Sequence, residues 1–148
     1  MPLTLNARDP AAIEQAAQRL AAGGLVGMPT ETVYGLAADA GNASAVGCIF
    51  TAKDRPSDHP LIVHIPPAID GDWRAAVTPL AHDVPDFAVR LMTAFWPGPL
   101  TLILPRRPDV AAVAAGGQDS VGVRCPAHPV AQALLVAARE HGVQGVAA

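Results

Sequence analysis

The sequence predicts an α/β fold in which helices cover a twisted, open sheet of mixed parallel and antiparallel strands. Amphipathic helical patterns alternate with short apolar runs, as is typical of α/β domains. Two of these runs, 25–28 and 33–38, are separated by a short polar turn and suggest a hairpin, which argues against a purely parallel sheet. No repeat, linker or low-complexity tract divides the 148 residues, so we expect a single domain over 1–148.

The first half of the chain predicts two helices and three strands. Asp9 and Pro10 are typical of an N-cap followed by proline at the first helical position. The pair Gly23-Gly24 predicts a left-handed end to that helix. The other elements expected here are strands over 25–28, 33–38 and 61–65, and a helix that begins at Asn42 or Ser44 and ends near Lys53.

The second half is less clearly patterned. Little structure is expected over 68–82, whereas 83–96 predicts a helix because Phe87, Leu91 and Phe95 recur at a spacing of four. The other expected elements are strands over 100–104 and 121–123, a helix over 129–141 capped by Gly142, and a strand starting at 143–147. That last strand meets the end of the sequence without a cap or polar tail, so we expect the domain to be incomplete at its C-terminus.

Composition argues against several classes of protein. The net charge of −3 argues against a protein that coats nucleic acid without specificity. No segment is typical of a signal peptide or a membrane span, so a cytoplasmic protein without a membrane partner is expected. Cys48 and Cys125 lie far apart and predict two reduced, buried thiols, and the histidines lack metal-ligand spacing, so no protein-bound metal is expected.

The segment with the strongest indication of chemistry contains the only lysine of the chain, Lys53. Arg55 follows two residues later. The compact ammonium charge of lysine and the planar guanidinium of arginine together suit the binding of phosphate. The alternative is a pair of solvated surface cations beside Asp54.

Other polar residues lie at the ends of apolar strands. The turn containing Thr30 and Thr32 follows a strand, where α/β proteins place ligands, although threonines also cap ordinary turns. His64 is the fourth residue of the apolar run 61–65 and is either a partly buried, satisfied side chain or a ligand contact. Ser120 and Arg124 flank the short apolar strand 121–123. The arginine at its end either binds an anion or is simply exposed at the strand terminus. No phosphate-binding loop, dinucleotide fingerprint, catalytic triad or pair of glycosidase carboxylates is present.

Taken together, these segments resemble the YrdC/Sua5 family of threonylcarbamoyl-AMP synthases. The resemblance covers nearly the whole chain in family order. It rests on G-G-L-V-G-M-P-T-E-T-V-Y-G-L at 23–36, the K-x-R of Lys53 and Arg55, P-L-I-V-H at 60–64, W-P-G-P-L-T at 96–101 and V-R-C-P-A-H-P at 123–129.

The resemblance implies a YrdC-like twisted sheet with a concave cavity. It also implies an enzyme that joins L-threonine, bicarbonate and ATP, with Mg²⁺, into threonylcarbamoyl-AMP and pyrophosphate. A separate transferase system would then place the threonylcarbamoyl group on tRNA. The resemblance assigns Thr32, His64 and Arg124 to L-threonine; Lys53, Arg55, His59 and Ser120 to the nucleotide, the first two as catalytic cations; and Thr30, Tyr34 and Thr101 to the pocket lining.

Two departures from the family pattern are visible. His59 stands where the family usually has asparagine. The family's S-x-N motif and a later arginine would follow the strand at 143–147, so we expect this chain to be a truncated representative with weak or no activity.

Two other functions remain open. One is a noncatalytic RNA-binding module, which the acidic net charge and few aromatic residues disfavour. The other is the related carbamoyl-transfer domain of hydrogenase maturation, whose larger proteins carry cysteine clusters not found here.

Overall fold

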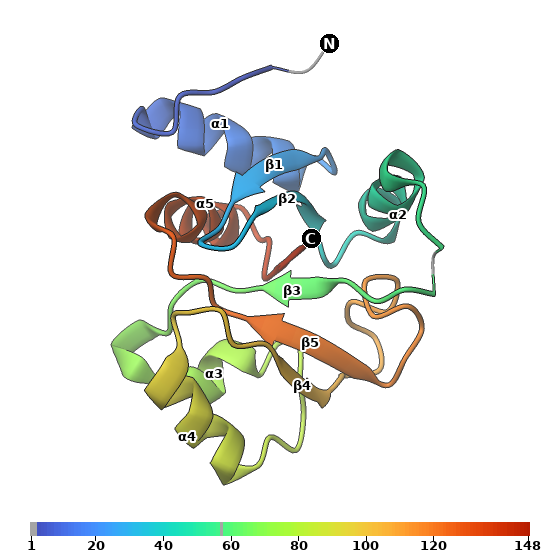
Figure 1. Ribbon diagram of the computed structural model, residues 1–148, viewed down its shortest axis with the longest axis vertical. Helices are drawn as coiled ribbons and strands as arrows, with labels where there is room; N and C mark the ends of the chain where they lie inside the picture. Colours follow the sequence, from blue (N-terminus) through green and yellow to red (C-terminus); the bar gives the residue numbers. More distant parts are fainter. Residues whose placement is uncertain (1–2, 57) are drawn as a thin grey trace.

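The computed structural model describes residues 3–56 and 58–148, and these residues form a mixed sheet of six strands (Figure 1). The spatial order is β1-β2-β6-β3-β5-β4, in which β3 and β5 are parallel and every other pair is antiparallel. The predicted mixed α/β sheet is therefore confirmed. The strands are β1 (Val26–Pro29), β2 (Tyr34–Asp39), β3 (Ile62–His64), β4 (Leu102–Pro105), β5 (Ser120–Arg124) and β6 (Val146–Ala147).

The helices begin where the sequence places capping residues. The side chains of Asp9, Asn42 and His128 each accept a hydrogen bond from a backbone N–H of the helix that follows. Asn42, and not Ser44, is thus the cap of the second helix. The helices are α1 (Pro10–Ala21), α2 (Ala43–Lys53), the 3₁₀ turn η1 (Ile69–Gly71), α3 (Trp73–Val77), α4 (Asp86–Phe95) and α5 (Pro129–Glu140).

The two faces of the sheet are covered unequally. On one face α1 and α5 pack over β1, β2 and β6, burying Met28, Ala37 and Val146. On the other face α2, α3 and α4 contribute to the larger core, which contains Val63 and Val123. No helix of the described residues covers the first face where it continues over β3, β5 and β4, which lie open in Figure 1. The fold therefore leaves part of one sheet face without a helix over it, although His64 and Arg124 on that face are buried.

Two predictions, for residues 68–82 and for Cys48, were wrong. Residues 68–82 contain η1 and α3, because burial of Trp73, whose ring centroid lies 5.5 Å from that of Trp96, stabilises a helix too short to form alone. In α4 the buried residues are Ala88 and Met92, so the phenylalanines point outward, Phe87 being 60% exposed and Phe95 57%.

Cys125 is buried as expected, but Cys48 lies on the outer side of α2 and is exposed. The helix that carries it buries its opposite side, at Val46, Ile49 and Phe50, as the pattern predicted. None of the described helices combines the length and apolar character needed to cross a membrane.

Candidate functional site

A buried arginine joins three segments at one edge of the open face. Arg124 ends β5, and its side chain is only 7% exposed. Its Nε donates to the carbonyl oxygen of Gly98 at 3.0 Å, and its Nη1 donates to Thr32 Oγ1 at 3.3 Å. Its Nη2 donates to a carboxylate oxygen of Glu31 in an ion pair. Residues more than ninety positions apart are therefore brought together at this edge.

The turn between β1 and β2 presents its hydroxyl groups to this arginine. Thr30 Oγ1 donates to the carbonyl oxygen of Val33 at 2.6 Å and lies 3.0 Å from Thr32 Oγ1. The backbone N–H groups of Thr32 and Val33 both donate to Thr30 Oγ1. Thr30 thus holds the turn together, which is the ordinary capping role, while Thr32 faces outward to Arg124. The sequence left both roles open, and the geometry divides them between the two threonines.

His64 lies beside Arg124 because β3 and β5 are parallel and these two residues are partners in the register. His64 is 5% exposed, and its Nδ1 is buried without a hydrogen-bond partner. Burial first, and then the neighbouring Arg124 cation, lower the pKa of His64 from 6.5 to about 4. The imidazole is therefore neutral near pH 7 and forms a buried wall beside Arg124.

The loop before β4 completes this edge of the site. Gly98 follows the cis peptide bond Trp96–Pro97, and its N–H donates to the carbonyl oxygen of Cys125 at 2.8 Å. Trp96 Nε1 donates to the carbonyl oxygen of Leu100, which keeps the loop compact. A side chain at position 98 would clash, because a Cβ there would lie 2.5 Å from the carbonyl oxygen of Phe95. Glycine is thus required for the conformation of this loop, which in turn presents the Gly98 carbonyl oxygen to Arg124.

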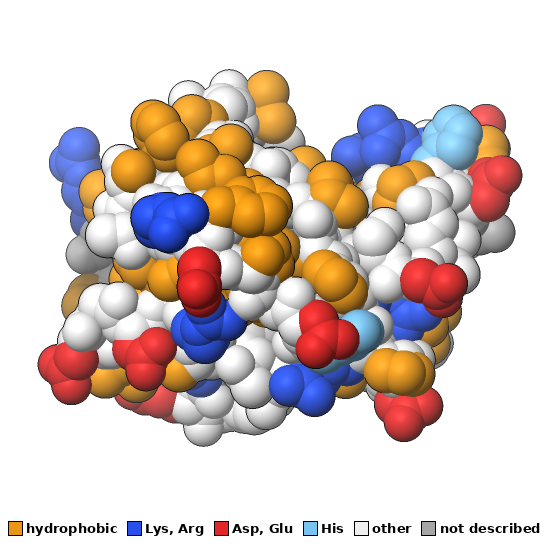
Figure 2. Space-filling model, turned by 90° about the horizontal axis from the view of Figure 1, so that it is seen from below, with side chains coloured by type: hydrophobic (Ala, Val, Ile, Leu, Met, Phe, Trp, Pro, Cys, Tyr) orange, Lys and Arg blue, Asp and Glu red, His pale blue; other side chains and the backbone are white. Residues whose placement is uncertain are grey.

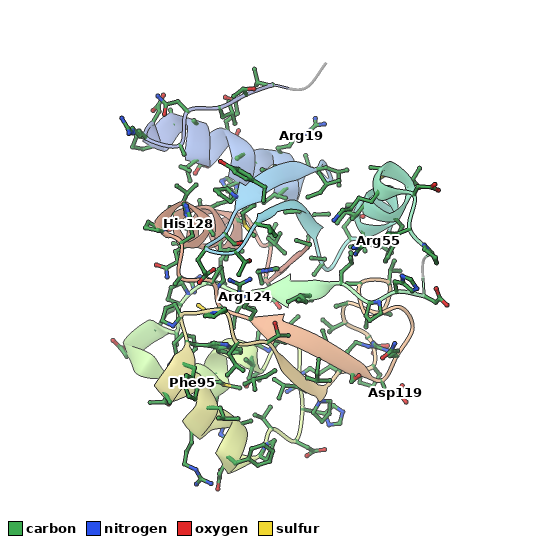
Figure 3. All side chains as sticks on the ribbon, viewed as in Figure 1. Arg19, Arg55, Phe95, Asp119, Arg124 and His128 are labelled. Carbon is green, nitrogen blue, oxygen red and sulfur yellow. The ribbon has the colours of Figure 1, made fainter. Side chains whose placement is uncertain are left out.

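Lys53 and Arg55 are held apart from this edge, at the end of α2. Asp54 lies between them in the left-handed conformation, with φ 52°. The N–H of Arg55 donates to the carbonyl oxygen of Phe50, and that of Asp54 to Thr51, which is the hydrogen-bond pattern of a Schellman motif. Both cations and His59 are exposed. Within residues 3–56 and 58–148, neither cation has an ion-pair partner within 4.0 Å. Figure 3 shows Arg55 beside α2 and Arg124 by the ends of β3 and β5.

The open face of β3 and β5 extends between these two groups. Gly122 has no side chain, and Ile62 and Ile103 are its neighbours in the register. Thr101 lies against it, since its Cγ2 would be 3.3 Å from a Cβ on Gly122. Ser120 is on the same face but four residues from Arg124, roughly 13 Å along the strand. Ser120 and Arg124 therefore mark opposite ends of one surface.

The predicted site residues form two clusters and two outliers, Tyr34 and Ser120, of which Ser120 lies at the far end of β5 from Arg124. Thr30, Thr32, His64 and Arg124 lie together, with Thr101 next to them on the sheet. Lys53 and Arg55 are neighbours at the end of α2, and His59 follows in the next loop. Tyr34 begins β2 and is 80% exposed, with no contact to either cluster among the described hydrogen bonds. Among the same residues no three His, Cys, Asp or Glu side chains are placed to hold a metal ion.

Sequence reasoning missed Glu31, Gly98 and Ala127. Glu31 accepts from Arg124 through one oxygen and from the Ala127 N–H, at 2.7 Å, through the other. The signal for Glu31 was a carboxylate between two turn threonines in a chain with an arginine at a strand end. The two backbone partners carry no sequence signal, because they depend on how the loops pack.

Comparison with known proteins shows which family this chain is similar to. The Sua5/YciO/YrdC family model, described under telomere recombination, matches residues 18–145. Threonylcarbamoyl-AMP synthase of Pyrococcus abyssi is 45% identical over 140 residues, which cover 91% of this chain and 39% of that protein. The Bacillus subtilis protein of the same name is 46% identical over 140 residues, covering 94% and 38%. The chain thus spans less than half the length of these relatives.

A solved structure agrees with the sequence comparisons. The crystal structure of P. abyssi Sua5 complexed with L-threonine superposes with a TM-score of 0.82 and 43% identity. The match covers 94% of this chain and 38% of that one.

Proposed function

The chain belongs to the Sua5/YciO/YrdC family. On this basis, we propose that it catalyses the threonylcarbamoyl-AMP synthase reaction. L-threonine, bicarbonate and ATP would give L-threonylcarbamoyl-AMP, pyrophosphate and water. A separate transferase would then pass the threonylcarbamoyl group to tRNA. The observation that supports this most directly is the convergence of Thr32, His64 and Arg124 beside an open sheet face, in a chain 43% identical to a protein solved with L-threonine.

Binding of L-threonine is proposed at the Arg124 edge. Thr32 would offer a hydroxyl group, and the neutral imidazole of His64 would form the buried side of the site next to Arg124. Arg124 would offer the guanidinium N–H groups left free by its protein partners, which suit a carboxylate. Thr30, Tyr34 and Thr101 would line the surroundings.

Binding of the nucleotide is proposed at the other end of the open face. Lys53 and Arg55 are exposed cations at a fixed turn, as a triphosphate requires, and His59 and Ser120 would add contacts. Mg²⁺ would arrive with ATP as part of the substrate. Magnesium commonly keeps several waters and binds through phosphates.

In this reaction the protein mainly positions the substrates and neutralises their negative charge. Threonine's amine first becomes a carbamate, and a carbamate oxygen then attacks the α-phosphate while the bond to pyrophosphate breaks. Two anions must approach each other, so cations fixed near the phosphates lower the barrier. Lys53 and Arg55 would neutralise the developing charge on the leaving pyrophosphate.

The test is release of pyrophosphate from ATP, which should require both L-threonine and bicarbonate. Because the 148 residues alone are expected to have weak or no activity, they are assayed beside a chain extended to the length of the relatives, and the variants below are made in that longer chain. Lys53→Ala should abolish this release and leave the unfolding midpoint unchanged, because the side chain is exposed. Arg90→Ala is the matched control, since Arg90 is an exposed cation on α4. Near-normal turnover in Lys53→Ala would contradict the role of Lys53. Salt-dependent RNA binding without threonine-dependent turnover would favour the noncatalytic alternative.

A further inference from the structure

Glu31 is the only carboxylate of the described residues in an ion pair with Arg124. It lies between the turn threonines Thr30 and Thr32, and both of its oxygens are used. One oxygen accepts from Arg124 Nη2, and the other accepts from the backbone N–H of Ala127 at 2.7 Å. Glu31 thus connects the β1–β2 turn to the end of β5 and to the loop before α5.

These contacts fix the plane of the guanidinium. Each nitrogen of Arg124 donates to a different segment: Nε to Gly98, Nη1 to Thr32 and Nη2 to Glu31. A guanidinium carries five N–H donors in a rigid fork, so three bonds in three directions leave no freedom to rotate. The two remaining N–H donors, one on Nη1 and one on Nη2, are thereby held in one orientation.

Glu31 also supplies the charge that lets Arg124 be buried. The arginine side chain is 7% exposed and that of Glu31 25%. A buried cation without a counter-charge is strongly disfavoured. His64, the neighbour in the register, is neutral near pH 7 and so adds no second positive charge beside Arg124.

The second contact indicates that Glu31 stays in place when a ligand arrives. Moving it away would break the bond to Ala127 as well as the ion pair, and hydrogen bonds to a carboxylate are about twice as strong as neutral ones. A ligand at this edge therefore meets Arg124 through the donors that Glu31 leaves free, and not through the place that Glu31 occupies.

We propose that Glu31 is a positioning residue of the L-threonine site, acting through Arg124 and Thr32 without touching the substrate. This inference rests on the proposed function, since it takes L-threonine as the ligand of this edge. It predicts that the charge of Glu31 affects L-threonine and leaves ATP, whose proposed cations are at the end of α2, unaffected.

The experiment measures binding of L-threonine and of ATP separately to the full chain by titration calorimetry. Glu31→Gln keeps the shape and removes the charge, and should weaken L-threonine binding about tenfold or more, the effect of losing one hydrogen bond to a charged group. ATP affinity should stay within about twofold. Glu14→Gln is the matched control, because Glu14 also pairs with a side chain, His141, but does so where α1 meets α5.

A second measurement does not depend on any ligand. The Nε–H of Arg124, bonded to Gly98 and buried, should give a sharp, slowly exchanging NMR signal in the wild-type chain. Glu31→Gln should broaden it. If that variant does not fold, Glu31→Asp, which withdraws the carboxylate by one carbon, is measured in both ways and should show changes in the same direction.

Unchanged or tighter L-threonine binding in a folded Glu31 variant would overturn the proposal; tighter binding would mean that Glu31 competes with the ligand's carboxylate. A wild-type chain that binds no L-threonine would refute the proposed function instead. The Arg124 signal would then decide: broadening in the variant supports positioning by Glu31, and an unchanged signal overturns it.

Discussion

The buried His64 should make the stability of the chain fall steeply with acid. Its pKa is about 4 in the folded protein, because burial and Arg124 disfavour the cation, and 6.5 is the reference value for an unfolded chain. As the pH falls below 6.5, the unfolded chain takes up the proton first, so the free energy of unfolding decreases. One pKa unit corresponds to 1.36 kcal/mol. The loss should therefore be about 1 kcal/mol at pH 5.5 and about 3 kcal/mol at pH 4.

The assay is urea unfolding of the wild-type chain and of His64→Gln at pH 7.5, 5.5 and 4. Carboxyl groups also titrate in this range, but they do so in both proteins, and the difference between the two unfolding free energies isolates His64. The wild-type chain should lose stability relative to the variant as the pH falls. A difference that stays constant from pH 7.5 to 4 would show that His64 titrates alike in both states, and would refute its burial beside Arg124.

Three further predictions concern single positions. Asp54→Gly should leave the unfolding free energy nearly unchanged, whereas Asp54→Val should lower it by about 1–2 kcal/mol because a β-branched residue is strained at φ 52°; equal stability of the two variants would contradict the left-handed turn. A thiol reagent should modify Cys48 and spare Cys125 in the native chain, because Cys125 is buried and its pKa is raised to about 12; mass spectrometry of the peptides checks this, and early modification of Cys125 would contradict it. Gly145→Ala should cost about 1–3 kcal/mol by urea unfolding, since its Cβ would lie 2.6 Å from Val63 Cγ1; wild-type stability would show that β3 and β6 are packed less tightly.

Local chemistry in the sequence predicted most of the elements. Asp9, Asn42 and Gly142 place helix ends where the structure has them, because caps and left-handed glycines act over only a few residues. The errors occurred where tertiary packing overrides local pattern. The spacing of Phe87 and Phe95 predicted a helix correctly, but not that this face would point to solvent.

The candidate site could be predicted in its parts but not in its arrangement. The sequence picks out Thr32, His64 and Arg124 as polar residues at strand ends. Their contact depends on the parallel register of β3 with β5 and on the turn that brings Thr32 to the sheet. Register is set by long-range pairing, which no local pattern specifies.

The surface in Figure 2 gives a second example of what the sequence pattern does not predict, namely which hydrophobic side chains are exposed. It looks at the end of the molecule formed by α3, α4 and β4, where hydrophobic side chains gather in one area with charged side chains around it. Apolar character alone marks Phe87, Phe95 and Ile103 as core residues, yet all three are more than half exposed.

By itself, the sequence determined that this is a mixed α/β chain with Lys53 and Arg55 next to each other at a helix end. Short-range forces, from caps, turns and hydrophobic periodicity, suffice for that. Only the tertiary structure decided that Arg124 is buried, that Glu31 balances its charge and that His64 is neutral beside it. The reason is that burial and pairing of charges depend on residues about ninety positions apart meeting in one place, and only the folded sheet provides that place.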